Sequence, residues 1–188
     1  MAKCLGAHSR DEIDSVVEHV FYVAQCAAED EEVEIDELDL AETKVRGLRW
    51  APKGYRHLGN GQSRVVVALC SQHVLKIDVM GNQNLEELQY WRQADKISKL
   101  YLCPILKAHM SPRCEWLLMA RCKLINDLHF DLLQETLTNE KLHAKADLVF
   151  QNLGYLDGEI VVLDYGNVRM RHKTLVDKLE RTFELTGF

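Results

Sequence analysis

The sequence predicts an α+β fold, and three features of the 188-residue chain indicate it. Apolar residues recur at helical spacing in residues 9–28. Short β patterns separated by turn residues fill residues 55–79 and 103–123. An Asp157-Gly158 pair between two apolar runs is the strongest short-range signal for a β-hairpin.

The composition is that of a folded protein, and it argues against several classes of partner. Hydrophobic residues make up 47% of the chain and charged residues 28%, which allows a packed core. The formal net charge of −6 opposes nonspecific binding to nucleic acid and to anionic membranes. No apolar run reaches the roughly 18 residues of a membrane span, and residues 1–12 lack the apolar core of a signal peptide. We therefore expect a cytoplasmic protein without direct nucleic-acid or membrane contacts.

Six cysteines and eight histidines are scattered along the chain. No two cysteines form a C-x2-C pair, and no histidines form an H-E-x-x-H motif. Most of the cysteines stand in apolar runs, where a reduced cysteine acts as a small hydrophobe. The sequence therefore predicts no zinc site.

The N-terminal part is predicted to be helical and then acidic. Ser9 is a suitable N-cap for the first helix, which has Asp11 and Glu12 in its first turn and is expected to pack against the main domain. Residues 29–42 are strongly acidic. They form either a solvated linker leading into a short helix or strand, or an acidic patch for a basic partner, for instance as a nucleic-acid mimic. We place a domain boundary after this part, near residue 50.

Two strands joined by a glycine turn are predicted in residues 55–69. Gly59 and Gly61 in that turn allow a ligand to approach the backbone closely. A third strand, residues 73–79, carries Lys76 between two apolar residues. Alternation places Lys76 on the face opposite these neighbours, and a buried ammonium there would need a partner. Taken alone, the pattern favours a lysine that points to solvent.

A second amphipathic helix is predicted in residues 82–100, with Glu86 and Glu87 in its early part. Either glutamate can pair with Lys76 across the sheet, or both are solvated surface acids. Two further strands are predicted around a turn at Pro112. Short helical patterns occupy residues 127–136, 138–145 and 174–185.

Three polar residues stand near the ends of the predicted hairpin strands. Asp147 and Asn152 precede the first strand, and Asp164 directly follows the apolar run that forms the second. In phosphoryl transfer, one carboxylate orients the attacking hydroxyl, while an amide and a second carboxylate hold magnesium. The alternative is an ordinary Asp-Gly hairpin with an Asx turn at Asn152 and a strand-terminal aspartate.

The spacing D-x4-N, followed by D-Y-G in residues 164–166, resembles the catalytic loop and metal-binding turn of the protein-kinase-like superfamily. The preceding elements follow the order of a kinase N-lobe: a glycine turn, a strand lysine, a helix with a glutamate, two more strands and a connector. The stretch YRHLGNGQSRVVV…HVLKI is similar to the start of the host-shutoff serine/threonine kinases of short-tailed bacteriophages, which suggests a phage origin.

This resemblance implies a bilobal kinase-like fold in three parts. A helical and acidic extension would occupy residues 1–50, and a five-stranded antiparallel N-lobe sheet residues 51–123. A strongly reduced C-lobe with the catalytic-loop-like hairpin would occupy residues 124–188.

The resemblance also implies ATP and Mg²⁺ as cofactors. Gly59 and Gly61 would cover the nucleotide phosphates, and Lys76 would contact the α- and β-phosphates. Backbone groups from Met119 to Arg121 would receive the adenine.

The remaining implied roles concern catalysis. The strand lysine would pair with Glu86 or Glu87. Asp147 would orient the substrate hydroxyl, and Asn152 and Asp164 would hold magnesium.

Several positions depart from the kinase pattern. The third glycine of G-x-G-x-x-G is replaced by Arg64. The usual His-Arg before the catalytic aspartate is Lys145-Ala146, and the lysine expected two residues after that aspartate is Val149. The short C-lobe also leaves no room for an activation segment or for the usual peptide-docking helices.

Two functions are therefore open. In the first, a minimal kinase transfers a phosphoryl group from ATP to a serine or threonine hydroxyl of a host protein, and the retained polar residues favour it. In the second, a degenerate kinase fold binds and inhibits a host enzyme or defence system, and the reduced C-lobe favours it because substrate positioning is most of what a kinase contributes. A weaker third interpretation is an acidic decoy formed by residues 29–42. If the protein is phage-encoded, each function would be exercised in the host cytoplasm.

Overall fold

The structure is a computed structural model, and it describes residues 8–43, 47–81, 83–96, 98–111, 114–125 and 152–165. The chain divides into two compact units. The first comprises Met1–Leu85 and Ile105–Arg121, and the second comprises Glu86–Pro104 and Cys122–Phe188.

Helix α1 (Arg10–Glu31) begins and ends with recognisable caps. The Ser9 hydroxyl accepts a hydrogen bond from the Glu12 backbone N–H at 3.1 Å, as the sequence predicts for an N-cap. The helix continues three residues beyond the predicted end and stops at Glu32, whose φ of 56° is left-handed. The prediction of an N-terminal amphipathic helix is confirmed.

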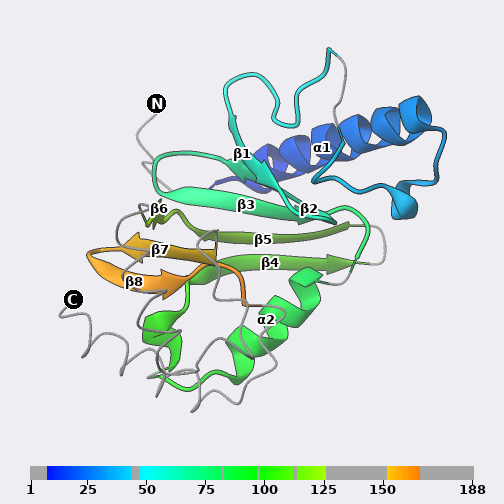
Figure 1. Cartoon of the computed structure of the whole chain (residues 1–188). Helices are drawn as coiled ribbons and strands as arrows, with labels where there is room; N and C mark the ends of the chain where they lie inside the picture. The colour runs from blue at the N-terminus through cyan, green and yellow to red at the C-terminus, as the bar shows by residue number, and fades with distance from the viewer. Residues whose placement is uncertain are drawn as a thin grey trace. The chain divides into compact units, whose positions relative to one another are not determined.

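A five-stranded antiparallel sheet forms the body of the first unit (Figure 1). Its strands lie in the spatial order β1-β2-β3-β5-β4. Their bounds are Arg56–Asn60 for β1, Arg64–Ala68 for β2, His73–Asp78 for β3, Ile105–Ser111 for β4 and Cys114–Ala120 for β5. The predicted α+β class and five-stranded sheet are confirmed.

The core of the first unit lies between α1 and one face of this sheet. Each strand of the pair β2 and β3 alternates, so that one set of side chains faces the helix. The fully buried members include Val16 and Val20 of α1, Val65 and Val67 of β2, and Leu75 and Ile77 of β3. The expectation that the first helix packs against the main domain is therefore confirmed.

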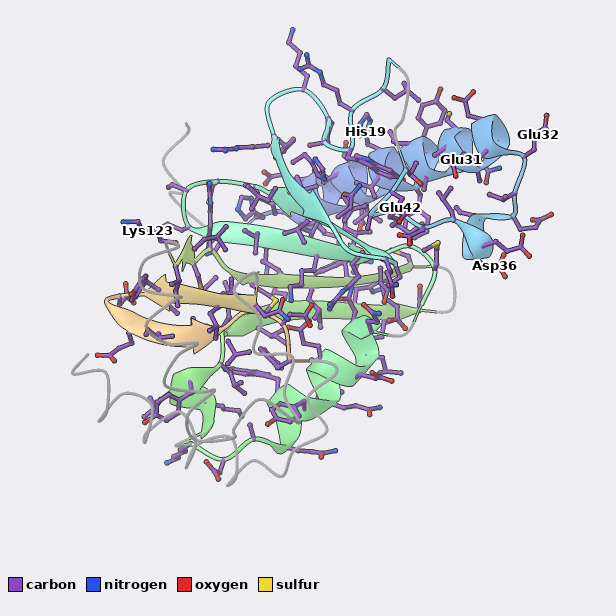
Figure 2. All side chains as sticks on the ribbon, viewed as in Figure 1. His19, Glu31, Glu32, Asp36, Glu42 and Lys123 are labelled. Carbon is purple, nitrogen blue, oxygen red and sulfur yellow. The ribbon has the colours of Figure 1, made fainter. Side chains whose placement is uncertain are left out.

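The acidic segment is anchored to the sheet rather than free of it. It contains a short 3-10 helix, η1 (Ile35–Glu37). Leu38 and Leu40 are buried, while the neighbouring carboxylates are exposed. The Leu40 N–H donates to the Gln62 carbonyl at 3.1 Å, and the Asn60 amide donates to the Leu40 carbonyl at 3.0 Å. Figure 2 shows Glu32 and Asp36 at the outer edge of this segment.

Helix α2 (Gln83–Gln93) is shorter than predicted. The prediction of one helix over residues 82–100 is wrong, because α2 ends at Gln93 and a separate 3-10 helix, η2 (Ser98–Tyr101), follows. Asp95 starts the new turn by accepting a backbone hydrogen bond from Lys99 at 3.1 Å. Aspartate favours such turns over helix interiors.

A three-stranded antiparallel sheet in the order β6-β7-β8 belongs to the second unit. It consists of β6 (Lys123–Leu124), β7 (Leu153–Leu156) and β8 (Glu159–Val162). The turn between β7 and β8 has positive φ at both Asp157 (53°) and Gly158 (95°), as a type I′ turn requires. The hairpin prediction is confirmed. The two-residue strand β6 was not predicted, because it is too short to give a periodic pattern.

The predicted helices over residues 127–136, 138–145 and 174–185 lie outside the described residues, as does Asp147. Among the helices that the structure describes, none is long and apolar enough to cross a membrane.

Candidate functional site

The glycine turn joins β1 to β2 and is open on its outer side. Gly59 lies in β1, and the Gly61 N–H closes the turn by donating to the Arg64 carbonyl at 2.8 Å. A Cβ atom added at either glycine would meet no atom within 4 Å. The two glycines are therefore not required by packing against neighbouring residues. Arg64, which replaces the third glycine of the kinase pattern, is buried.

Lys76 lies in the middle of β3, between Val66 of β2 and Leu117 of β5. Only 7% of Lys76 is exposed, so the interpretation that it points to solvent is wrong. The alternation of apolar and polar residues suggested one solvent-facing side of β3, but both faces of this strand are covered. All residues from Val74 to Asp78 are buried. A buried ammonium needs anionic or polar partners, which fits the alternative interpretation that Lys76 pairs with a glutamate of α2.

The start of α2 is anchored to the sheet by Asn84, which is fully buried. Its side-chain amide donates to the backbone carbonyls of Lys76 and Glu115, both at 3.2 Å. The Asp78 carboxylate accepts the N–H groups of Gly81 at 2.9 Å and of Asn84 at 3.2 Å. These contacts fix the backbone of the strand that carries Lys76.

The carboxyl group of Glu115 lies near Asp78, the residue that accepts the Asn84 N–H. Burial raises its pKa above the ordinary value, and the nearby Asp78 carboxylate raises it further. A backbone hydrogen bond from Leu85 opposes these effects. The Glu115 Oε2 atom is buried without a hydrogen-bond partner. No local sequence pattern indicates this group of residues, which the fold assembles from β3, α2 and β5.

The two neighbouring glutamates of α2 differ sharply in exposure. Glu86 is exposed, whereas Glu87 is completely buried. A fully buried carboxylate is rare unless it is paired. Burial therefore distinguishes Glu87 from Glu86 as the carboxylate that is shielded from water.

Asn152 and Asp164 lie at the open end of the β7–β8 hairpin, where both are half-buried. Leu153 of β7 pairs with Val162 of β8, so Asn152 directly precedes the first paired residue and Asp164 follows soon after the last. The Leu163 N–H donates to the Asn152 carbonyl at 2.7 Å and closes this end. Asn152 and Asp164, the two residues predicted to hold magnesium, thus stand at the same end of the hairpin. An amide oxygen and a carboxylate are hard ligands of the kind that Mg²⁺ takes.

Tyr165, the residue after Asp164, is fully buried in the second unit. Its hydroxyl donates to the Cys103 carbonyl at 2.9 Å, and its ring packs against Tyr90. Burial raises the pKa of Tyr165, and the charges of Glu87 and Asp164 raise it further. Both carboxylates therefore lie near one tyrosine, which links α2 to the hairpin end. The sequence analysis assigned no role to Tyr165, although it is the middle residue of D-Y-G.

Met119 and Arg121 lie at the end of β5 and just beyond it. Met119 is buried and stands between Val74 of β3 and Ile105 of β4. The Arg121 N–H donates to the Gln72 carbonyl at 2.7 Å, and its guanidinium donates to the Cys70 carbonyl at 2.9 Å. These bonds fix the position of the segment predicted to receive adenine.

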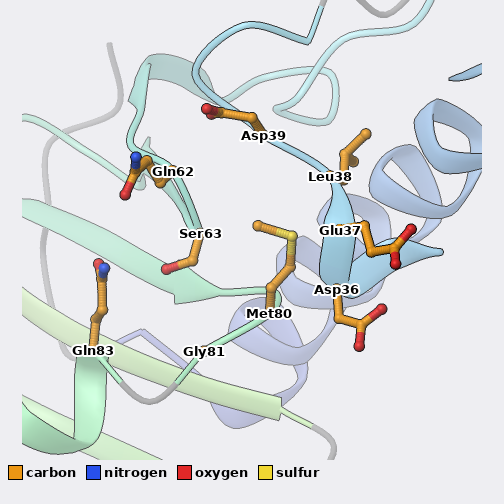
Figure 3. A pocket seen from close by; sticks show the side chains of 9 residues that line it. All are labelled: Asp36, Glu37, Leu38, Asp39, Gln62, Ser63, Met80, Gly81 and Gln83. Atoms are coloured by element: carbon orange, nitrogen blue, oxygen red, sulfur yellow. The ribbon is translucent and has the colours of Figure 1, made fainter. Parts of the chain in front are cut away.

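A pocket of about 300 Å³ lies next to the glycine turn (Figure 3). Gln62 and Ser63 line it from the end of the turn, and Met80 and the η1 segment line it from the other side. Figure 3 shows the carboxylates of Asp36 and Glu37 pointing away from Ser63.

The predicted site residues divide between the two compact units. Gly59, Gly61, Lys76, Met119 and Arg121 belong to the first unit, and Glu86, Glu87, Asn152 and Asp164 to the second. Asp147 lies outside the described residues.

Scanned against models of known protein families, the sequence matches none, and no curated protein matches it. Among solved structures, the chain is similar to WbdD in complex with a kinase inhibitor, with a TM-score of 0.41 and 10% identity over 77% of this chain and 46% of that one. A second structure, of the bifunctional kinase-methyltransferase WbdD, gives a TM-score of 0.38 and 18% identity over 72% of this chain and 39% of the other. The chain thus spans less than half the length of the WbdD chains that it matches.

Proposed function

We propose that the chain is a minimal kinase that uses ATP and Mg²⁺ to phosphorylate a serine or threonine hydroxyl of a protein. The observation that carries the proposal is the hairpin end, where the Leu163 N–H donates to the Asn152 carbonyl at 2.7 Å, so that Asn152 and Asp164 stand at the same end of the strand pair. An amide and a carboxylate in this relation suit a magnesium ion that bridges nucleotide phosphates. A phage-encoded kinase of this type would act on proteins of the host cytoplasm.

The proposed roles of the other residues follow from the sequence resemblance, and burial supports part of them. Lys76 would contact the α- and β-phosphates, and Glu87 would be its ion-pair partner in preference to the exposed Glu86. The glycine turn at Gly59 and Gly61 would cover the phosphates, since its outer side is open. Asp147 would orient the substrate hydroxyl.

Two hydrogen-bond donors of Arg121 already bind within the protein, so other backbone groups of residues 119–121 would have to bind the adenine. Both the N–H and the guanidinium of Arg121 donate to the loop between β2 and β3. Backbone carbonyls from Met119 to Arg121 would then accept the adenine amino group.

A second function is favoured by the surface around the glycine turn. The bulky Arg64 replaces a glycine of the phosphate-binding pattern. The pocket next to the turn has Asp36, Glu37 and Asp39 among its lining residues. Negative charge close to the turn opposes a triphosphate and suits a basic side chain of a protein partner. This alternative is a pseudokinase that inhibits a host enzyme or defence protein by binding it.

Thermal unfolding measured with and without ATP and magnesium distinguishes the kinase from the pseudokinase inhibitor. A ligand at about 100 times its dissociation constant stabilises the folded state by about 2.7 kcal/mol. The kinase proposal expects such a shift with ATP and Mg²⁺ together, and a smaller one with ATP and a chelator. Absence of any shift at millimolar nucleotide would contradict the kinase and favour the inhibitor.

Transfer of the γ-phosphoryl group is the second readout. Radiolabelled ATP should label a host protein extract in the presence of the wild-type chain and not of the Asp147→Ala variant. A nucleotide-dependent shift without any transfer would identify a nucleotide-binding pseudokinase.

A further inference from the structure

Three side chains that can bind a transition metal converge in the first unit. They are His8, just before α1, and Cys70 and His73 in the loop between β2 and β3. One ligand atom from each lies within 4.8 Å of the others. The Cys70 sulfur is 3.8 Å from Nδ1 of His73. The rings of His8 and His73 are 5.3 Å apart and nearly perpendicular.

These separations suit a tetrahedral zinc site. With Zn–S near 2.3 Å and Zn–N near 2.0–2.1 Å, a tetrahedral angle places sulfur and nitrogen roughly 3.6 Å apart. The distance of 3.8 Å between Cys70 and His73 is within a few tenths of that value. Once Cys70 is reduced, the three ligand atoms, which lie within 4.8 Å of one another, are close enough to share one ion.

The surroundings of the cluster also match those of metal sites. Nδ1 of His8 contacts the Glu12 carboxylate at 2.9 Å, which leaves Nε2 of His8 to face a metal. Such carboxylate–histidine pairs orient the ring and increase its basicity as a ligand. The Gln72 N–H donates to the Cys70 sulfur at 3.3 Å, an interaction that favours the thiolate.

The loop that carries two of the ligands is rigidly held. The N–H groups of Leu69 and Cys70 both donate to the His73 carbonyl, at 3.1 and 3.4 Å. The Arg121 guanidinium donates to the Cys70 carbonyl at 2.9 Å. The backbone of His8 is fixed by a hydrogen bond from Lys107 at 3.3 Å. Pre-positioned ligands of this kind are what a structural metal site requires.

We propose that these three residues, His8, Cys70 and His73, bind a Zn²⁺ ion whose remaining coordination position is open to water or to a further ligand. Cys70 and His73 form a C-x2-H pair, a spacing at which two ligands reach one ion, and His8 supplies the third ligand from a distant part of the chain.

Cys70 is disulfide-bonded in the structure, and a zinc thiolate is the reduced counterpart of that state. A thiol or phosphine reductant supplies two electrons, and two protons complete the conversion of the disulfide to two thiols. Zinc binding then releases the thiol protons. The site therefore holds metal in a reducing compartment and a disulfide in an oxidising one.

No zinc site was expected from the sequence, because Cys70 and His73 do not form a C-x2-C motif and His8 lies about 60 residues before them. The antiparallel pairing of β2 with β3 and the packing of α1 on the sheet bring the two parts together. The proposal does not depend on kinase activity.

The test uses the untagged full chain, produced in zinc-supplemented medium and purified with a phosphine reductant and no chelator. Zinc released on denaturation should amount to one ion per chain. Cys70→Ser and His73→Ala should reduce it to nearly none, whereas the matched controls Cys26→Ser and His57→Ala should retain one. A reduced wild-type chain without zinc, or variants that keep their zinc, would overturn the proposal.

Cobalt substitution tests the ligands without relying on variants that fold. Co²⁺ added to the reduced, zinc-free wild-type chain should produce the intense visible bands of tetrahedral cobalt and a thiolate charge-transfer band. Glu12→Gln should weaken zinc binding by about 10- to 100-fold in competition with a zinc-binding dye. An octahedral cobalt spectrum without thiolate absorption would show that this cluster is not the metal site.

Discussion

The Leu163 backbone N–H donates to the Asn152 carbonyl at 2.7 Å, and this bond joins the residue after β8 to the residue before β7. Because of it, the amide of Asn152 and the carboxylate of Asp164 leave the hairpin at the same end. The Asp157-Gly158 turn closes the opposite end. The hairpin therefore offers two aspartates in contrasting positions, one in the candidate magnesium site and one remote from it.

Asp164→Asn should abolish the response to nucleotide, while Asp157→Asn should leave it unchanged. Removing one ligand charge is expected to weaken Mg²⁺-dependent binding by about 100-fold, which lowers a stabilisation of about 2.7 kcal/mol to about 0.4 kcal/mol at the same ATP concentration. Asparagine tolerates the positive φ of the turn, so the control should fold normally. Thermal unfolding with ATP and Mg²⁺ measures both, and an equal loss in the two variants would exclude the hairpin end as the metal site.

Glu87→Gln should destabilise the fold, and Glu86→Gln should not. The Glu87 carboxylate is fully buried, and neutralising a buried, partnered charge typically costs about 1–3 kcal/mol. Glu86 is exposed, so its change should stay within about 0.5 kcal/mol. Urea unfolding of the two variants gives the comparison. Similar stabilities would contradict the assignment of Glu87 as the paired glutamate.

Gly61→Ala should leave stability unchanged and weaken nucleotide binding, whereas Gly154→Ala should destabilise the fold. A Cβ at Gly61 meets no atom within 4 Å, so only an incoming ligand would feel it. A Cβ at Gly154 would lie 3.0 Å from both the Cys122 Cβ and the Lys123 carbonyl, and such overpacking costs about 1–3 kcal/mol. Chemical denaturation and nucleotide titration of both variants test this. A Gly61→Ala chain that binds nucleotide normally would argue against a phosphate-covering turn.

Asn84→Ala should destabilise the protein by about 1–3 kcal/mol, because it leaves two backbone carbonyls without their side-chain donor. Gln89→Ala, an exposed position of the same helix, should change stability by less than about 0.5 kcal/mol. Urea unfolding is the measurement. If Asn84→Ala were as stable as Gln89→Ala, the amide would not be the anchor of α2.

Glu115→Gln should stabilise the protein at neutral pH, and the gain should shrink as the pH falls. The Glu115 pKa is raised in the folded state, so the folded wild-type chain binds this proton more tightly than the unfolded chain. Wild-type stability is therefore lost as the pH rises from the unfolded pKa through the folded one. The variant has no such loss.

Solvent screening limits the expected gain at pH 7 to about 1 kcal/mol or less. Urea unfolding of both chains from pH 4 to pH 8 measures it. A difference that grows toward low pH would contradict the assigned direction of the shift.

Local sequence signals predicted most of the individual elements. The Ser9 cap, the apolar periodicity of α1 and the Asp157-Gly158 turn each depend on residues close together in the chain, and each appears in the structure. The predicted extent of α2 was wrong, because the helix ends at Gln93, two residues before Asp95, and aspartate favours turns over helix interiors. The strand β6 exists only through its pairing with β7, which no local pattern encodes.

The sequence by itself determined the class of fold, the order of the elements and the polar residues on which the proposed nucleotide site depends. Only the tertiary structure decided which of them are buried. It showed that Lys76 is enclosed on both faces of β3, and that Glu87 rather than Glu86 is shielded from water. It also brought His8 next to Cys70 and His73. Burial and long-range proximity arise when distant segments pack together, and a periodic pattern records the face of one element but not what covers that face.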